Sequence, residues 1–189
     1  MSRLDLLAGP NGAGKTTFFE RIIEPDRPGL PFVNADRIAA QRFPADVAER
    51  SYEAATIAAK TRQALIDARL DFCTETVFSH PSKADLIHTA TAAGYDVALQ
   101  VIMIPFELSG PRVAARVQAG GHEVPMSKLA ARYQRIWPLV AGVVPTCWKA
   151  TFYDNSTDSG PNEIASFRTG TADYPPRWPT WAPTSISAL

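Results

Sequence analysis

Short apolar runs alternate with segments of helical periodicity along most of the chain. Several of the runs carry few charges and are bounded by Gly, Pro, Asn or Asp, as strands buried on both faces often are. Strands that alternate with helices in this way are typical of an α/β fold with a parallel sheet. We predict strands over residues 3–8, 30–34, 71–75, 96–104 and 148–154, and helices over residues 46–70, 82–93, 111–118 and 127–140.

Residues that start and stop helices refine these limits. A further helix with an apolar stripe follows the first strand and ends at Pro25, because proline cannot continue it. Ser82 is the predicted N-cap of the helix over residues 82–93, and Gly94 is its C′ residue. Pro111 fits the first turn of the helix that it begins.

The end of the chain has a different composition. From Tyr174 onward it holds four of the 16 prolines and two of the four tryptophans, and proline at this density excludes a long helix. We predict one domain over residues 1–170 and a tail over residues 171–189. The tail is either extended, with its tryptophans against the domain, or a segment that binds a partner.

Composition excludes several classes of protein. The chain has 189 residues, of which 46% are hydrophobic and 20% are charged, as in ordinary globular domains. Lys plus Arg equals Asp plus Glu at 19 each, which argues against a protein that coats nucleic acid. No apolar run is long enough to span a membrane, and no signal peptide is recognisable. Cys73 and Cys147 are expected to be reduced, so we predict a cytoplasmic protein. The balanced charge and the lack of a long apolar run predict no nucleic-acid and no membrane partner.

The strongest motif begins where the first predicted strand ends. The run GPNGAGKT fits the P-loop pattern G-x-x-x-x-G-K-[ST] at every fixed position, between a strand and a helix. Its glycines let backbone N–H groups approach a polyphosphate, and the helix N-terminus adds partial positive charge. We expect a nucleoside triphosphate to contact Gly9, Asn11, Gly12, Ala13, Gly14, Lys15, Thr16 and Thr17. Lys15 is predicted to hold the β and γ phosphates, and Thr16 to bind Mg²⁺.

Two acidic residues follow predicted strands on the edge where a parallel sheet binds its ligands. Asp36 is placed to accept a proton from a hydroxyl group, although Asp36 or Asn34 could instead cap the next helix. Glu75 is placed to orient a substrate or to hold a water bound to Mg²⁺, with an exposed carboxylate at a strand end as the alternative. The second protein contact to Mg²⁺ is therefore either Asp36 or Glu75.

Four arginines suggest a lid. Two lie on each of two predicted helices, and a guanidinium group can pair with two phosphate oxygens at once. The chain is too short for a large motor and lacks the base-reading motif of GTPases, so a small kinase with a lid over residues 109–140 fits best. His122 is expected to form a hydrogen bond in the hinge. The arginines are Arg112, Arg116, Arg132 and Arg135, and the hinge is Gly120–Gly121.

The ordered set GPNGAGKTT, NAD, TETVFS, RVQAGGHEVP, RYQRI and YDNS resembles the zeta-toxin kinase family. The resemblance implies a P-loop kinase fold with a five-stranded parallel sheet and a helical lid. It also implies phosphoryl transfer from ATP, with Mg²⁺, to the sugar of UDP-N-acetylglucosamine, and an antitoxin as a possible partner. The roles that it implies are Lys15 as the P-loop lysine, Asp36 as the base, Glu75 as a substrate contact, Arg116 and Arg132 as arginines on the transferred phosphate, and Asn155 near the adenine.

Other functions stay open at this point. Val77 stands where the family usually has a threonine that binds substrate. A kinase for another hydroxyl group, such as that of a nucleoside, a different nucleotide-sugar or an antibiotic, is one alternative. A non-catalytic ATP-binding module that acts through its tryptophan-rich tail is another.

Overall fold

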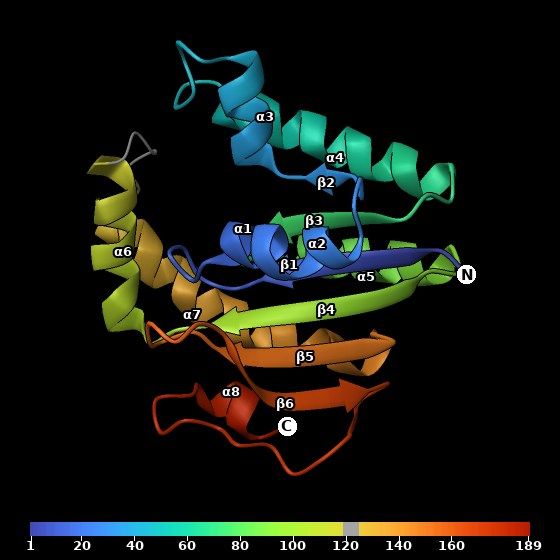
Figure 1. Cartoon of the computed structure of the whole chain (residues 1–189), viewed down its shortest axis with the longest axis vertical. Helices are drawn as coiled ribbons and strands as arrows, with labels where there is room; N and C mark the ends of the chain where they lie inside the picture. Colours follow the sequence, from blue (N-terminus) through green and yellow to red (C-terminus); the bar gives the residue numbers. More distant parts are fainter. Residues whose placement is uncertain (119–124) are drawn as a thin grey trace.

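The computed structural model describes residues 1–118 and 125–189. Within these residues, seven strands form one sheet in the order β2-β3-β1-β4-β5-β6-β7 (Figure 1). The strands are β1 (Arg3–Ala8), β2 (Phe32–Val33), β3 (Phe72–Thr76), β4 (Asp96–Met103), β5 (Lys149–Asp154), β6 (Asn162–Arg168) and β7 (Thr171–Ala172). The helices are α1 (Lys15–Phe18), the π-helical η1 (Phe19–Ile23), α2 (Glu24–Asp26), α3 (Ala35–Arg42), α4 (Ser51–Asp67), α5 (Ser82–Ala92), α6 (Phe106–Gln118), α7 (Met126–Val143), the 3-10 helix η2 (Val144–Thr146) and α8 (Thr184–Ser187).

The five predicted strands form the parallel part of the sheet. β1 lies in its interior, where Leu4 pairs with Phe72 of β3 on one side and with Val97 of β4 on the other. The α/β class is thus confirmed, but the predicted number of strands is too small. β6 and β7 extend the sheet beyond β5 in antiparallel directions. Four consecutive residues of β6 are buried, so this strand lacks the alternation that would have marked it as a half-exposed strand.

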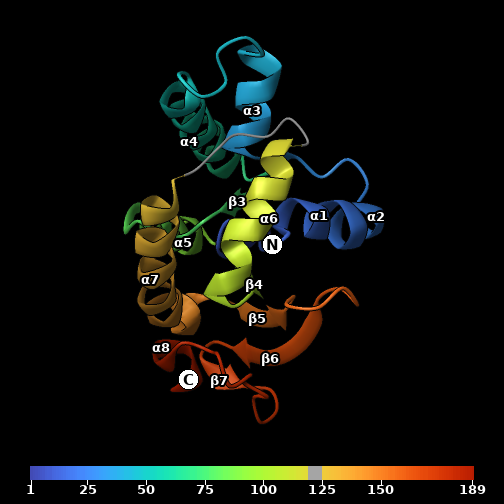
Figure 2. The same ribbon diagram turned by 90° about the vertical axis from the view of Figure 1, so that its left-hand side faces the viewer.

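Helices cover both faces of the sheet (Figures 1 and 2). Side chains alternate along β1, so Leu4 and Leu6 belong to the larger core, which includes residues of α5 and α7, while Leu7 faces Phe19 and Ile23 on the other side. α3 and α4 lie beside β2 at one edge, and α6 crosses the carboxyl ends of the parallel strands. That edge is where a parallel sheet places its ligands.

Some helix limits differ from the predictions. α6 begins at Phe106, so Pro111 lies inside this helix and not in its first turn. α5 begins at Ser82 itself, with Pro81 as its N-cap, so Ser82 is not the cap. Gly94 directly follows the C-cap Ala93 and has a φ of 82°, as predicted for a C′ glycine.

The last residues pack onto the folded body. The ring of Trp178 lies edge-on to Phe152, with 5.2 Å between centroids, and is stacked on Phe167 at 6.3 Å. Ile186 of α8 is fully buried. Hydrophobic contacts of this kind hold the proline-rich segment against β5, β6 and α7. Across the described part of the chain, no helix combines the length and the apolar character that crossing a bilayer requires.

We predict that Trp178→Ala lowers the free energy of unfolding by about 2 kcal/mol, since a half-buried ring and two aromatic contacts are lost. Urea denaturation followed by circular dichroism measures this change. Tyr52→Ala is the control, because Tyr52 is 85% exposed on α4 and its loss should shift the midpoint little. Equal midpoints for the two variants would contradict the anchoring role of Trp178.

Candidate active site

The P-loop connects β1 to α1 through a backbone that needs glycine. Gly14 is the N-cap of α1 with a φ of 85°, in the left-handed region that favours glycine. A Cβ atom at Gly14 would lie 2.8 Å from Nδ2 of Asn155, and one at Gly9 would lie 2.2 Å from the carbonyl oxygen of Ile102. The glycines therefore let the loop pack directly against β4 and against the loop after β5.

Hydrogen bonds from two distant segments fix the shape of the P-loop. Ser109 of α6 donates to the carbonyl of Asn11 at 2.6 Å. The side-chain amide of Asn155, just after β5, donates to the carbonyl of Ala13 at 2.8 Å. Arg112 of α6 in turn donates to the backbone carbonyl of Asn155 at 2.9 Å. The loop is therefore positioned before any ligand binds, which reduces the entropy cost of ligand binding.

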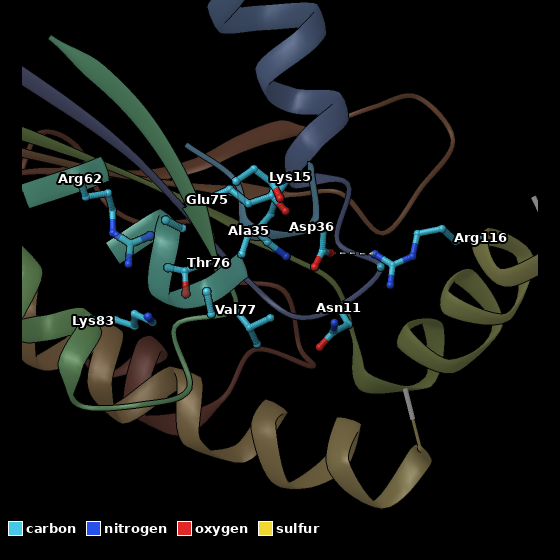
Figure 3. Close-up of a pocket in the computed structure, with 14 residues that line it drawn as sticks. Asn11, Lys15, Ala35, Asp36, Arg62, Glu75, Thr76, Val77, Lys83 and Arg116 are labelled. Atoms are coloured by element: carbon cyan, nitrogen blue, oxygen red, sulfur yellow. Dashed lines mark ion pairs between the residues drawn. The ribbon is translucent and has the colours of Figure 1, made fainter. Parts of the chain in front are cut away.

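Two hollows border the P-loop, and Gly12 lines both. We call the first the acceptor pocket; it has a volume of about 190 Å³ and is lined by Lys15, Asp36 and Arg116, three of the four predicted catalytic residues (Figure 3). We call the second the nucleotide pocket; it has a volume of about 290 Å³. The nucleotide pocket is lined by Gly12, Gly14, Thr17, Phe18, Arg21, Ile22, Arg112, Asn155, Thr157, Asp158, Gly160 and Pro161.

Lys15 is buried at the inner end of the acceptor pocket, with 7% of its surface exposed. Its amino group donates to the carbonyl of Pro10 at 2.9 Å. Burial lowers the pKa of Lys15, while the negative charges of Glu75 and Asp36 oppose that shift. Phosphate oxygens beside Lys15 would favour its charged form in the same way.

Thr16 and Glu75 lie side by side at the carboxyl edge of the sheet. The Thr16 hydroxyl donates to Oε2 of Glu75 at 2.7 Å, and Glu75 is the next-to-last residue of β3. No three His, Cys, Asp or Glu side chains of the residues described gather into a metal cage. A hydroxyl and one carboxylate suit Mg²⁺, which takes one or two protein ligands together with waters and phosphate oxygens. This geometry fits Glu75 better than Asp36 as the second contact to the metal.

Asp36 and Asn34 have separate roles in the structure. The side chain of Asn34 accepts a hydrogen bond from the backbone N–H of Arg37 at 3.1 Å, so Asn34 is the cap of α3. Asp36 has a side chain that is 82% exposed at the acceptor pocket. Arg116 of α6 approaches it, with 3.9 Å between Nη1 and Oδ2 (Figure 3). Asp36 is thus available to a ligand in the acceptor pocket, opposite Arg116.

The four arginines of the predicted lid lie in different places. Arg116 lines the acceptor pocket, and Arg112 lines the nucleotide pocket. Arg135 of α7 donates to the carbonyl of Ser79 at 3.2 Å. Arg132, also on α7, lines neither pocket. The predicted hinge at Gly120–Gly121 and the predicted hydrogen bond of His122 fall outside the described residues.

The acceptor pocket also contains two basic residues that sequence reasoning missed. Arg62 of α4 and Lys83 of α5 line it together with Lys15 and Arg116. Neither residue belongs to a motif, and an isolated basic residue on a helix normally indicates a solvent-exposed face. Their side chains reach one pocket only in the folded structure, since the strand β3 separates α4 from α5 in the sequence.

The structure is similar to several solved kinase and toxin structures. The match to the AvrRxo1-ORF1:AvrRxo1-ORF2 complex with sulphate ions has a TM-score of 0.73 at 18% identity and covers 92% of this chain. That to the PezAT toxin-antitoxin system of Streptococcus pneumoniae has a TM-score of 0.66 at 17% identity, and covers 86% of this chain and 70% of that one. The match to shikimate kinase from Acinetobacter baumannii has a TM-score of 0.52 at 18% identity, and covers 85% of this chain and 86% of that one. The chain spans 60% of the length of the matched AvrRxo1 chain.

These matches confirm the predicted P-loop kinase fold, since PezAT and shikimate kinase share it with this chain. A family model described as Zeta toxin matches residues 3–144, three quarters of the chain. The chain therefore belongs to the zeta-toxin family, as its motifs indicated. No curated protein sequence matches it significantly.

We predict that Asn155→Ala weakens ATP binding about fivefold, because the P-loop loses the hydrogen bond to Ala13 that fixes its shape. Isothermal titration with a non-hydrolysable ATP analogue measures the change. Asn162→Ala removes an exposed asparagine from β6 and serves as the control. Unchanged affinity in Asn155→Ala would show that this side chain does not support the nucleotide site.

Proposed function

We propose that this chain is an ATP- and Mg²⁺-dependent kinase that transfers the γ-phosphate to a hydroxyl group of UDP-N-acetylglucosamine. The observation that carries the proposal is the acceptor pocket, in which Lys15, Asp36, Glu75 and Arg116 meet beside the P-loop. Membership of the zeta-toxin family supports the choice of acceptor. Phosphoryl transfer needs little more from a protein than positioning and electrostatic stabilisation, which these residues can supply.

In this proposal the two pockets bind the two substrates. The nucleotide pocket takes the adenosine part of ATP near Asn155, and its phosphates lie along the P-loop toward Lys15. Thr16 and Glu75 would hold Mg²⁺, and the bound ion would supply positive charge that offsets the negative charge of the phosphates. The hydroxyl group of the acceptor then lies in the acceptor pocket, within reach of Asp36.

The proposed reaction transfers one proton to Asp36 and one phosphoryl group to the acceptor. A carboxylate oxygen of Asp36 accepts the proton of the hydroxyl group as its oxygen bonds to the γ-phosphorus. The bond from the γ-phosphorus to the bridging oxygen breaks, and ADP leaves with the electron pair. Lys15 and Arg116 stabilise the negative charge on the transferred group. We assign the same task to Arg132 only as a prediction, since it lies on α7 outside the pocket lining.

We also propose an antitoxin as a partner and the cytoplasm as the place of action. The PezAT structure is described as a toxin-antitoxin system, and the AvrRxo1 structure contains two proteins in complex. An inhibitory partner suits a kinase whose product harms the cell. A kinase for another hydroxyl acceptor is the second candidate, and Val77 in the lining of the acceptor pocket favours it.

We expect Asp36→Asn to abolish transfer to UDP-N-acetylglucosamine, by at least about a hundredfold, because the amide cannot accept the proton. Mass spectrometry of the acceptor, 80 Da heavier in the product for the added phosphoryl group, measures turnover; titration with an ATP analogue checks that nucleotide binding persists. Asp46→Asn, an exposed residue between α3 and α4, should keep full activity.

Each other outcome has a clear meaning. Near-normal turnover by Asp36→Asn would contradict the role of Asp36 as base. Release of ADP with a different hydroxyl compound, but not with the nucleotide-sugar, would replace the acceptor and keep the kinase. If the protein binds ATP but no acceptor compound stimulates the release of ADP, the result would support the non-catalytic ATP-binding module instead.

A further inference from the structure

Two basic side chains lie opposite Arg116 in the acceptor pocket. Figure 3 shows Arg62 and Lys83 together on one side of the pocket, with Lys15, Asp36 and Glu75 between them and Arg116. Both side chains are half-buried, Arg62 on α4 and Lys83 on α5. They extend the positive lining of the pocket beyond the region that transfers the phosphoryl group.

Among the residues that the structure describes, these two charges have no acidic partner. Within residues 1–118 and 125–189, neither side chain forms an ion pair or a hydrogen bond, whereas Arg3, Arg27, Arg37 and Arg50 all pair with carboxylates. Burial lowers the pKa of both, and the charge of Arg62 lowers that of Lys83 further. Two neighbouring half-buried cations cost free energy unless an anion compensates them.

A second hollow begins at the same two residues. Arg62 and Lys83 also line a groove of about 250 Å³ between α4 and α5. Asp85, the one acidic residue in that lining, is exposed and pairs with neither cation. The two cations therefore lie where the acceptor pocket and the groove meet. An acceptor longer than the pocket would extend past them toward the groove. The rest of the groove is lined by Ala59, Gln63, Ser82, Leu86 and Thr89.

We propose that Arg62 and Lys83 form a subsite for a phosphate group of the acceptor. This inference rests on the proposed kinase function and narrows its substrate to hydroxyl compounds that are already phosphorylated. The guanidinium group of Arg62 can donate two parallel hydrogen bonds to phosphate oxygens, and the ammonium group of Lys83 adds a compact positive charge. Binding at this point holds the reacting hydroxyl group toward Asp36, on the other side of the pocket.

A binding experiment tests the subsite without turnover. The protein is saturated with a non-hydrolysable ATP analogue and Mg²⁺, so that the P-loop is filled. Inorganic phosphate is then added, and the thermal midpoint is compared with that in sodium chloride of equal ionic strength. Phosphate should raise the midpoint of the wild type but not that of the Arg62→Gln/Lys83→Gln double variant. Lys60→Gln, an exposed lysine on α4, should behave as the wild type.

Turnover then identifies the source of the phosphate. The double variant should raise the KM for UDP-N-acetylglucosamine about tenfold or more, with little change in kcat, because binding and not chemistry is affected. If one terminal phosphate is enough, the KM for N-acetylglucosamine 1-phosphate should also rise in the double variant. If the diphosphate is required, only the KM for the nucleotide-sugar should rise. Unphosphorylated N-acetylglucosamine should show equal KM values in both proteins.

The results separate this inference from the proposed function. No phosphate-specific stabilisation of the wild type, or equal stabilisation of the double variant, would overturn the subsite even if the enzyme phosphorylates an acceptor. Specific stabilisation that depends on both cations, without turnover of any acceptor, would keep the subsite and reject the proposed reaction.

Discussion

The close contact between the P-loop and strand β4 is the constraint on which the rest of the site depends. A Cβ atom at Gly9 would lie 2.2 Å from the carbonyl oxygen of Ile102, so the loop leaves the sheet along a path open only to glycine. That path carries Lys15 into the pocket and brings Thr16 to the end of β3, beside Glu75. Asn155 and Ser109 then hold the loop from the other side.

Much of this site could be predicted from the sequence, because its chemistry is local. The P-loop spacing predicts which residues face the phosphates. The carboxyl ends of parallel strands meet at one edge, which predicted that Asp36 and Glu75 would lie near Lys15. Composition could not decide between Asn34 and Asp36 as the cap of α3. Only the observed hydrogen bond from Arg37 to Asn34 does so.

The features that the sequence did not reveal depend on contacts between distant segments. Arg62 and Lys83 share a pocket because α4 and α5 lie next to each other, and neither helix records that contact in its own pattern. The strand β6 is buried over four consecutive residues, among them Phe167, on which the distant Trp178 is stacked. Its pattern therefore lacks the alternation of an edge strand. Arg116 and Arg132 both lie on predicted lid helices, yet only Arg116 lines the acceptor pocket.

The position of Gly12 between the two pockets has a consequence for the order of events in catalysis. Because the hollows that we propose for the nucleotide and the acceptor are separate and share this one glycine of the loop, neither substrate would have to leave before the other enters. Such an arrangement favours a ternary complex and a single direct transfer between the substrates. A route in which the protein itself carries the phosphoryl group between two half-reactions would gain nothing from it.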